Sequence, residues 1–284
     1  AWRDFYCGGT MTILHFNRFP ASAAILAFAV CSALPASAAD LGAPLPVVSQ
    51  RASDWKFSLA TYAWLPWISG DLDVRGRSFD VDVAPNDILR SLDWSTLPAW
   101  MSYAELRNGP LTFFNDIVWT ALEDGQGFNR KFISGDVQVD YTQLTVELGA
   151  AYAVWSQGGA TVDVLAGGRY WRQSTDVYVD LGSGLALDRS ATVDWVDPFI
   201  GARLIQPVAP GQSILVRGDV GGFGAGSDFS WQALATYNMK LCETGGTVID
   251  GYFGYRALAV DYSEGSYELD VVQHGPVMGL TMNF

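Results

Sequence analysis

Charged side chains recur on one face of alternating segments along most of the chain. Seven acids and seven bases share these faces, so opposite charges can pair across an enclosed space. The acids are Glu105, Asp116, Glu147, Asp163, Asp197, Asp219 and Asp250. The bases are Lys56, Arg107, Arg169, Arg203, Arg217, Lys240 and Arg256. The equal numbers predict a cross-linked interior without a wide open pore.

His274 is the candidate for acid–base catalysis near neutral pH, because the only other histidine in the sequence is His15. Such catalysis would need the histidine beside a serine or an acid, because a proton must be moved near neutral pH. No serine lies within two residues of His274. His274 lies an even number of positions before Met278 and Phe284, so in a strand it would share their face, which we expect to point outward. We therefore favour an interfacial structural role and keep a hydrolase using His274 as a disfavoured alternative. No catalytic, cofactor-binding or metal-binding residue is predicted.

The charge balance excludes some partners. Acids outnumber bases 30 to 17 and the pI is about 4.4, which argues against nucleic acid as a partner. The excess acids lie in loops, and six crowd the first of them: Asp71, Asp73, Asp80, Asp82, Asp87 and Asp93. We interpret them as solubilising charges. A calcium site stays an open alternative, although the spacing lacks the glycine and terminal glutamate of an EF-hand loop.

Alternation with a period of two indicates the elements that carry these residues. Between Trp231 and Leu241 the odd positions are mostly apolar and the even positions mostly polar, and residues 277–284 repeat the pattern. No later window offers the 18 or so consecutive apolar residues of a membrane-spanning helix. The ten expected strands are 54–68, 95–108, 110–123, 134–155, 160–178, 191–208, 212–223, 228–241, 246–262 and 267–284.

The connections alternate between tight turns and longer acidic loops. Tight turns are expected near 107–110, 156–159, 209–212 and 242–246, and longer loops near 69–94, 123–134 and 178–190. This pattern predicts an all-β fold, a closed antiparallel transmembrane β-barrel of about 10 strands, with 8 or 12 as alternatives. Residues 70–84 are the segment that would add a further hairpin.

A soluble β-sandwich or lipocalin-like barrel is the rival interpretation, because it alternates as well. Such a protein buries apolar residues inside, whereas here the charges share the faces assigned to the lumen. Asn115, on an expected outward face, is an exception.

The first long loop contains one helical signal. Pro85 begins a segment in which Ile88, Leu89 and Leu92 have helical spacing. We expect a short amphipathic helix over residues 85–92. It would either cover the barrel mouth or pack against the rim, and both alternatives stay open.

The first part of the chain is interpreted as outside the mature fold. Residues 11–38 combine Arg18, an apolar stretch and the small-residue site Ala36-Ser37-Ala38, which together indicate a secretory signal peptide. Residues 1–10 are interpreted as upstream or vector-derived sequence, 39–53 as a periplasmic linker, and 54–284 as the barrel.

Longer segments carry a family resemblance, namely 195–204 (WVDPFIGARL), 218–232 (GDVGGFGAGSDFSWQ), 254–262 (GYRALAVDY) and 275–284 (GPVMGLTMNF). Together they resemble a family of uncharacterised proteobacterial outer-membrane β-barrel proteins. The resemblance implies the barrel and the cell outer membrane, and it supplies no activity. Terminal Phe284 is similar to the signal that the barrel assembly machinery recognises.

These observations leave several functions open. We expect a structural or interaction barrel with a narrow, charge-plugged lumen, surrounded by outer-membrane lipid and lipopolysaccharide. A narrow, cation-preferring diffusion channel for ions or small solutes is the alternative, because acidic loops attract cations. The sequence does not indicate an oligomeric state.

Overall fold

The computed structural model describes residues 55–74, 77–92, 98–130, 133–180, 186–265 and 267–284. The expected upstream segment 1–10, signal peptide 11–38 and linker 39–53 all lie outside the described residues. No helix among the described residues is long and apolar enough to cross a membrane.

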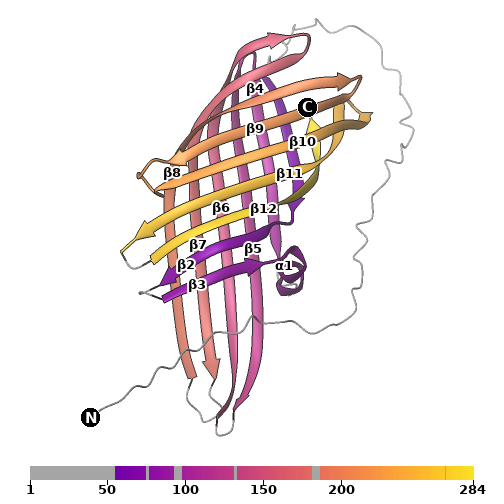
Figure 1. The fold of residues 1–284 in the computed structure, drawn as a ribbon. Helices are drawn as coiled ribbons and strands as arrows, with labels where there is room; N and C mark the ends of the chain where they lie inside the picture. The colour runs from indigo at the N-terminus through magenta and orange to yellow at the C-terminus, as the bar shows by residue number, and fades with distance from the viewer. Residues whose placement is uncertain (1–54, 75–76, 93–97, 131–132, 181–185, 266) are drawn as a thin grey trace, which may run out of the picture. The chain divides into compact units, whose positions relative to one another are not determined.

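Ten antiparallel strands form the closed barrel that alternation predicts (Figure 1). They are β1 (Trp55–Trp64), β4 (Ala99–Asn108), β5 (Leu111–Arg130), β6 (Ile133–Gln157), β7 (Ala160–Asp180), β8 (Ala186–Ala209), β9 (Gln212–Gly222), β10 (Phe229–Thr244), β11 (Thr247–Glu264) and β12 (Tyr267–Asn283). Each strand pairs with the next around the barrel, and β1 closes it by pairing with β12. The ten-strand prediction is confirmed.

The first strand ends earlier than predicted, because Leu65 and Pro66 interrupt it. Proline cannot donate to a strand ladder, so β1 ends at Trp64 and a separate hairpin begins at Trp67. The backbone approaches β12 closely at this break: a Cβ on Gly275 would lie 2.2 Å from the Leu65 carbonyl oxygen. Only glycine fits there.

The hairpin consists of β2 (Trp67–Val74) and β3 (Arg77–Val83). β12 therefore has two successive partners on one edge, first β1 and then β2. The hairpin occupies the segment that the sequence marked as an optional addition. Its position on β12 extends the barrel wall beyond the end of β1.

One short helix, α1 (Pro85–Ser91), follows the hairpin, as predicted. Pro85 begins the helix, and the Asp87 carboxylate accepts a bond from the Ala84 backbone N–H at 3.4 Å. Ile88 is buried, and the helix packs against β5, where Leu92 forms a bridge with Leu122. Of the two alternatives, this placement corresponds to packing against the wall near the rim.

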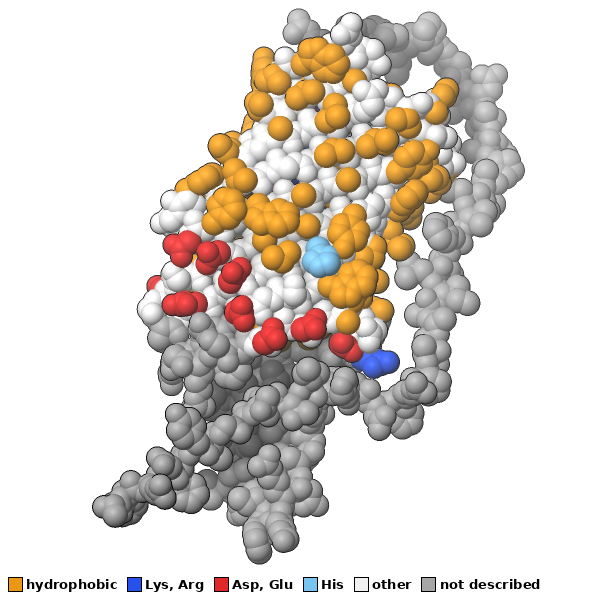
Figure 2. All heavy atoms as spheres, in the orientation of Figure 1, with side chains coloured by type: hydrophobic (Ala, Val, Ile, Leu, Met, Phe, Trp, Pro, Cys, Tyr) orange, Lys and Arg blue, Asp and Glu red, His pale blue; other side chains and the backbone are white. Residues whose placement is uncertain are grey.

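The two faces of the barrel have opposite character. Outward side chains such as Leu148, Ile200 and Met278 are apolar and 62%, 57% and 57% exposed. Inward Glu147 and Arg169 are completely buried. Figure 2 shows apolar side chains covering the visible upper part of the wall, with acidic side chains gathered along its lower border. This inside-out distribution excludes the soluble rival and is that of a transmembrane barrel.

The short turns define the periplasmic end, because outer-membrane barrels have short turns on that side. These turns connect β4 to β5, β6 to β7, β8 to β9 and β10 to β11. The opposite, outer end carries the β2–β3 hairpin and α1.

The lumen is less uniformly polar than the sequence suggested. Beyond the buried charges, towards the outer end, inward residues form an apolar cluster that includes Trp64, Trp171, Trp195 and Leu258. The rings of Trp195 and Tyr262 stack with centroids 4.0 Å apart. Aromatic side chains therefore line the outer half of the lumen, which the charged residues of the sequence did not indicate.

Candidate functional site

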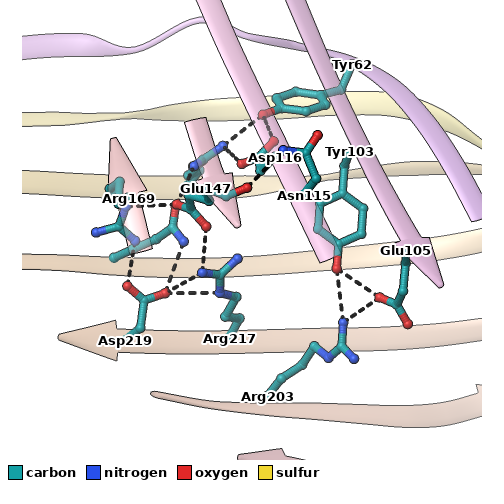
Figure 3. A network of polar contacts seen from close by, with 12 residues as sticks. Tyr62, Tyr103, Glu105, Asn115, Asp116, Glu147, Arg169, Arg203, Arg217 and Asp219 are labelled. Carbon is teal, nitrogen blue, oxygen red and sulfur yellow. Dashed lines mark hydrogen bonds and ion pairs between the residues drawn. The ribbon is translucent and has the colours of Figure 1, made fainter. Parts of the chain in front are cut away.

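The largest buried polar cluster centres on Glu147 of β6 (Figure 3). Its carboxylate accepts bonds from Arg169 of β7 at 2.9 Å and Arg217 of β9 at 2.7 Å, and Arg256 of β11 lies 3.5 Å away. Strand inclination around a barrel allows groups from non-adjacent strands to meet in the lumen. Glu147 thereby connects three strands across the interior.

Two further carboxylates complete this central cluster. Asp219 pairs with Arg169 at 2.7 Å and with Arg217 at 2.8 Å, and Asp116 pairs with Arg256 at 2.8 Å. The cluster therefore contains three arginines and three acids and is electrically neutral. Neutrality matters here, because an uncompensated buried charge carries a large desolvation cost.

A tyrosine hydroxyl strengthens one edge of the central cluster. The Tyr62 hydroxyl donates to Asp116 at 2.6 Å and accepts from Arg256 at 2.9 Å. Gln232 adds a donor to Asp219 at 3.1 Å. These neutral groups satisfy lone pairs that the arginines leave free.

A second, smaller cluster lies nearer the periplasmic end. Arg203 of β8 bonds Glu105 of β4 and Asp163 of β7, each at 2.7 Å. The Tyr103 hydroxyl donates to Glu105 at 2.8 Å and accepts from Arg203 at 3.2 Å (Figure 3). Arg107 is more distant, 3.4 Å from both Glu105 and Asp163. Two arginines and two acids make this cluster neutral as well.

Aromatic rings separate and cover the charges. The Arg217 guanidinium lies 5.1 Å from the Phe114 ring centroid, and Arg169 lies 5.1 Å from that of Phe199. Arg256 lies 5.0 Å from the Trp64 ring. Such cation–π contacts hold the guanidinium planes in place while excluding water. The arrangement can occlude a lumen.

Four of the predicted interior residues lie outside the two clusters. Asp197 is completely buried and accepts bonds from the Trp171 indole at 3.0 Å and the Ser227 backbone N–H at 2.7 Å. Asp250 accepts from Asn283 at 2.8 Å, and Lys240 pairs with Glu243 near the periplasmic rim. Lys56 lies exposed beside Arg107 at the periplasmic mouth. Among the described residues, no arginine forms an ion pair with Asp197 or Asp250.

Sequence reasoning missed the two tyrosines of the clusters. Tyr62 lies on the face of β1 that carries Lys56, and Tyr103 lies on the face of β4 that carries Glu105. The same parity rule that selected the charges therefore contained the signal for both hydroxyls.

His274 lies on the outer wall among aromatic residues. Its Nδ1 shares a 2.6 Å hydrogen bond with the Tyr255 hydroxyl, and its ring stacks on Trp67 with centroids 6.0 Å apart. The strand keeps its register through Gly275-Pro276, so no bulge reverses the parity of His274. Among the described residues, no serine or carboxylate bonds this imidazole.

Phe284, the expected assembly signal, stacks on Phe57 at the periplasmic end.

An acidic row crosses four neighbouring strands beyond the apolar surface. Asp80, Asp71, Asp270 and Asp261 stand directly opposite one another in successive pairings of β3, β2, β12 and β11. All four are exposed. Like charges directly opposed across strands are destabilising, so this outward row contrasts with the paired interior.

Comparison with protein-family models and with curated proteins finds no match. Among solved structures, the chain is similar to the outer membrane protease OmpT of Escherichia coli at 9% identity and a TM-score of 0.44, covering 82% of this chain and 98% of that one. It is similar to the translocator domain of autotransporter NalP from Neisseria meningitidis at 11% identity and a TM-score of 0.39, covering 81% and 89%. It is also similar to Ail of Yersinia pestis at 12% identity and a TM-score of 0.30, covering 81% of this chain and 98% of that one.

All three TM-scores are below 0.5, so the assignment rests on the geometry of the barrel itself. A closed barrel satisfies every strand edge inside a bilayer, and an apolar exterior around a polar core is the outer-membrane arrangement. The protein is therefore a β-barrel of the Gram-negative outer membrane.

Proposed function

We propose that the protein is a non-conducting outer-membrane barrel with a structural or interaction role in the envelope. The observation that carries this proposal is the pair of neutral clusters spanning the lumen. The four arginines Arg169, Arg203, Arg217 and Arg256 have side chains that are 7% exposed or less. An ion crossing the barrel would have to displace these ion pairs.

The layers on either side of the central cluster support the same proposal. The apolar cluster with Trp171 and Trp195 fills the outer side, and Phe114 and Phe199 lie between the two charged clusters. A conducting path needs continuous polar groups or water, and aromatic layers interrupt it. With the lumen filled, the outer surface and loops are left to carry the biological role.

The proposed partners follow from this surface. The apolar wall would contact outer-membrane lipid, and its outer border would contact lipopolysaccharide. Recognition by the barrel assembly machinery and membership of the proteobacterial barrel family that the sequence resembles belong to the same proposal. A catalytic role is disfavoured because His274 bonds a tyrosine and stacks on a tryptophan.

Single-channel recording in planar bilayers tests the proposal. Folded protein, verified by its heat-dependent mobility shift in gels, should give no stable conductance steps. Arg217→Ala should either introduce conductance or lower the temperature of the heat-induced mobility shift, because Arg217 joins Glu147 to Asp219 at the centre of the lumen. Stable, cation-selective steps from the unaltered protein would overturn the proposal in favour of a narrow diffusion channel.

A further inference from the structure

Two cations face each other at the periplasmic mouth of the lumen. Lys56 of β1 and Arg107 of β4 are directly opposite in the strand pairing. Directly opposed residues have Cβ atoms about 4.5–5.5 Å apart, and like charges at that separation destabilise the pair. Lys56 shares the inward face with Tyr62, as Arg107 does with Glu105. The mouth therefore concentrates positive charge on the lumen side.

A pocket accompanies this pair. Lys56, Arg107, Asn108 and Gly109 line it, and its volume is about 350 Å³. Small-molecule sites in proteins have volumes of about 300–1,000 Å³, so this pocket suits a small ligand. Asn108 and Gly109 lie at the β4–β5 turn, so the pocket is at the periplasmic end of the barrel.

The neighbouring acids do not neutralise the pair. Glu105 and Asp163 each bond Arg203 at 2.7 Å, whereas Arg107 lies 3.4 Å from both. Lys56 forms no ion pair within the described part of the chain. Three cations thus share two carboxylates, leaving one positive charge in excess on this side of the mouth. Asp250 of β11, a further acid on the inward face, accepts a bond from Asn283.

We propose that this pocket binds a small oxyanion, a phosphate or carboxylate group that enters from the periplasm. Lys56 supplies a mobile point charge, and Arg107 supplies planar donors suited to two oxygens of one group. Asn108 and Gly109 complete the lining of the pocket. A bound oxyanion would neutralise the excess charge and relieve the opposed cations. The inference goes beyond the proposed structural role and does not depend on whether the barrel conducts.

Phosphorus-31 NMR of inorganic phosphate, titrated with folded protein in phosphatidylcholine vesicles, tests the site. We expect line broadening that saturates and that excess acetate reduces, while chloride at equal ionic strength does not. Lys56→Gln and Arg107→Gln should each weaken binding about 10-fold or more, since each removes a charge-assisted contact. Lys56→Arg should retain binding.

Lys240→Gln is the matched control, because Lys240 is also exposed near the periplasmic end but pairs with Glu243. It should leave phosphate binding unchanged. Equal weakening by Lys240→Gln and Lys56→Gln would overturn the proposal, as would the absence of saturable binding to the unaltered protein. A second arm adds phosphatidylglycerol to the vesicles. Competition would identify a lipid headgroup as the source of the anion, lack of competition a soluble ligand, and either result supports the site.

Discussion

The lumen and the outer rim use the same carboxylates in opposite ways. Inside, Glu147 lies between three arginines, and the acids and bases of its cluster are equal in number. At the rim, Asp261 and Asp270 stand opposite each other, with Asp71 next in the row. Burial makes the difference, because water screens exposed charges, whereas an enclosed charge must find its partner within the protein.

The two regions differ in whether a carboxylate stabilises the fold. A carboxylate of the central cluster cannot be removed without taking an ion-pair partner from the arginines that it bonds. An exposed carboxylate in the row contributes repulsion, so its removal should relieve the fold. Three substitutions, taken in order of expected effect, examine this difference.

The largest effect is expected for Glu147→Ala. It leaves Arg169 and Arg217 without one of their two carboxylates and removes a neighbour of Arg256, so the free energy of unfolding should fall by about 3–5 kcal/mol. Urea titration of the folded barrel in lipid vesicles measures this change. Glu243→Ala is the control, because Glu243 pairs with Lys240 at the exposed rim and its loss should not shift the midpoint. Equal midpoints for the two variants would contradict the structural role of the central cluster.

A smaller loss is expected for Tyr62→Phe. This variant removes only the hydroxyl that bonds Asp116 and Arg256, so the buried groups lose a neutral partner while the ion pair stays. The expected cost is about 1–3 kcal/mol in the same titration. Tyr237→Phe removes an exposed hydroxyl bonded to Gln212 and should cost less. Equal losses of unfolding free energy for Tyr62→Phe and Tyr237→Phe would show that the Tyr62 hydroxyl does not stabilise the central cluster.

Much of the fold could be predicted because strand alternation is a property of the backbone. Inward and outward faces follow from parity alone, and parity correctly separated Arg217 from its exposed neighbour Val216. The end of β1 was not predicted, because the pairing of β12 with both β1 and β2 is a long-range choice. The proline at position 66 was the local signal for that break.

The pairing inside the lumen was harder to predict than the faces. Which carboxylate meets which arginine depends on strand inclination and stagger, and one sequence does not fix these. Asp197 illustrates the problem: it shares the inward face with Arg203 yet bonds Trp171 and the backbone of Ser227. The aromatic filling of the outer lumen was missed because charges alone were used to define the interior.

The smallest effect, and the one of opposite sign, is expected for Asp261→Asn in the exposed row beyond the apolar surface. Partial burial, with the carboxylates of Asp270 and Asp228 nearby, raises the pKa of Asp261 above its ordinary value. The folded state therefore binds more protons than the unfolded state between the ordinary and the raised pKa, and stability falls as pH rises through that window. Asp261→Asn should raise the free energy of unfolding at pH 7 by about 0.2–1 kcal/mol, and the gain should vanish below the ordinary pKa of about 3.9.

Asp194→Asn separates this repulsion from a general effect of removing acids. Asp194 is also exposed, but it stands directly opposite Arg172 on β7, so its charge is attracted rather than repelled across the strands. Its removal should lower the unfolding midpoint or leave it unchanged at every pH. If both variants stabilised the barrel equally at pH 7, net charge would be the cause, and the direct opposition of Asp261 and Asp270 would carry no specific cost. A gain confined to Asp261→Asn and lost on acidification would assign the cost to that opposed pair, because protonation and substitution remove the same repulsion.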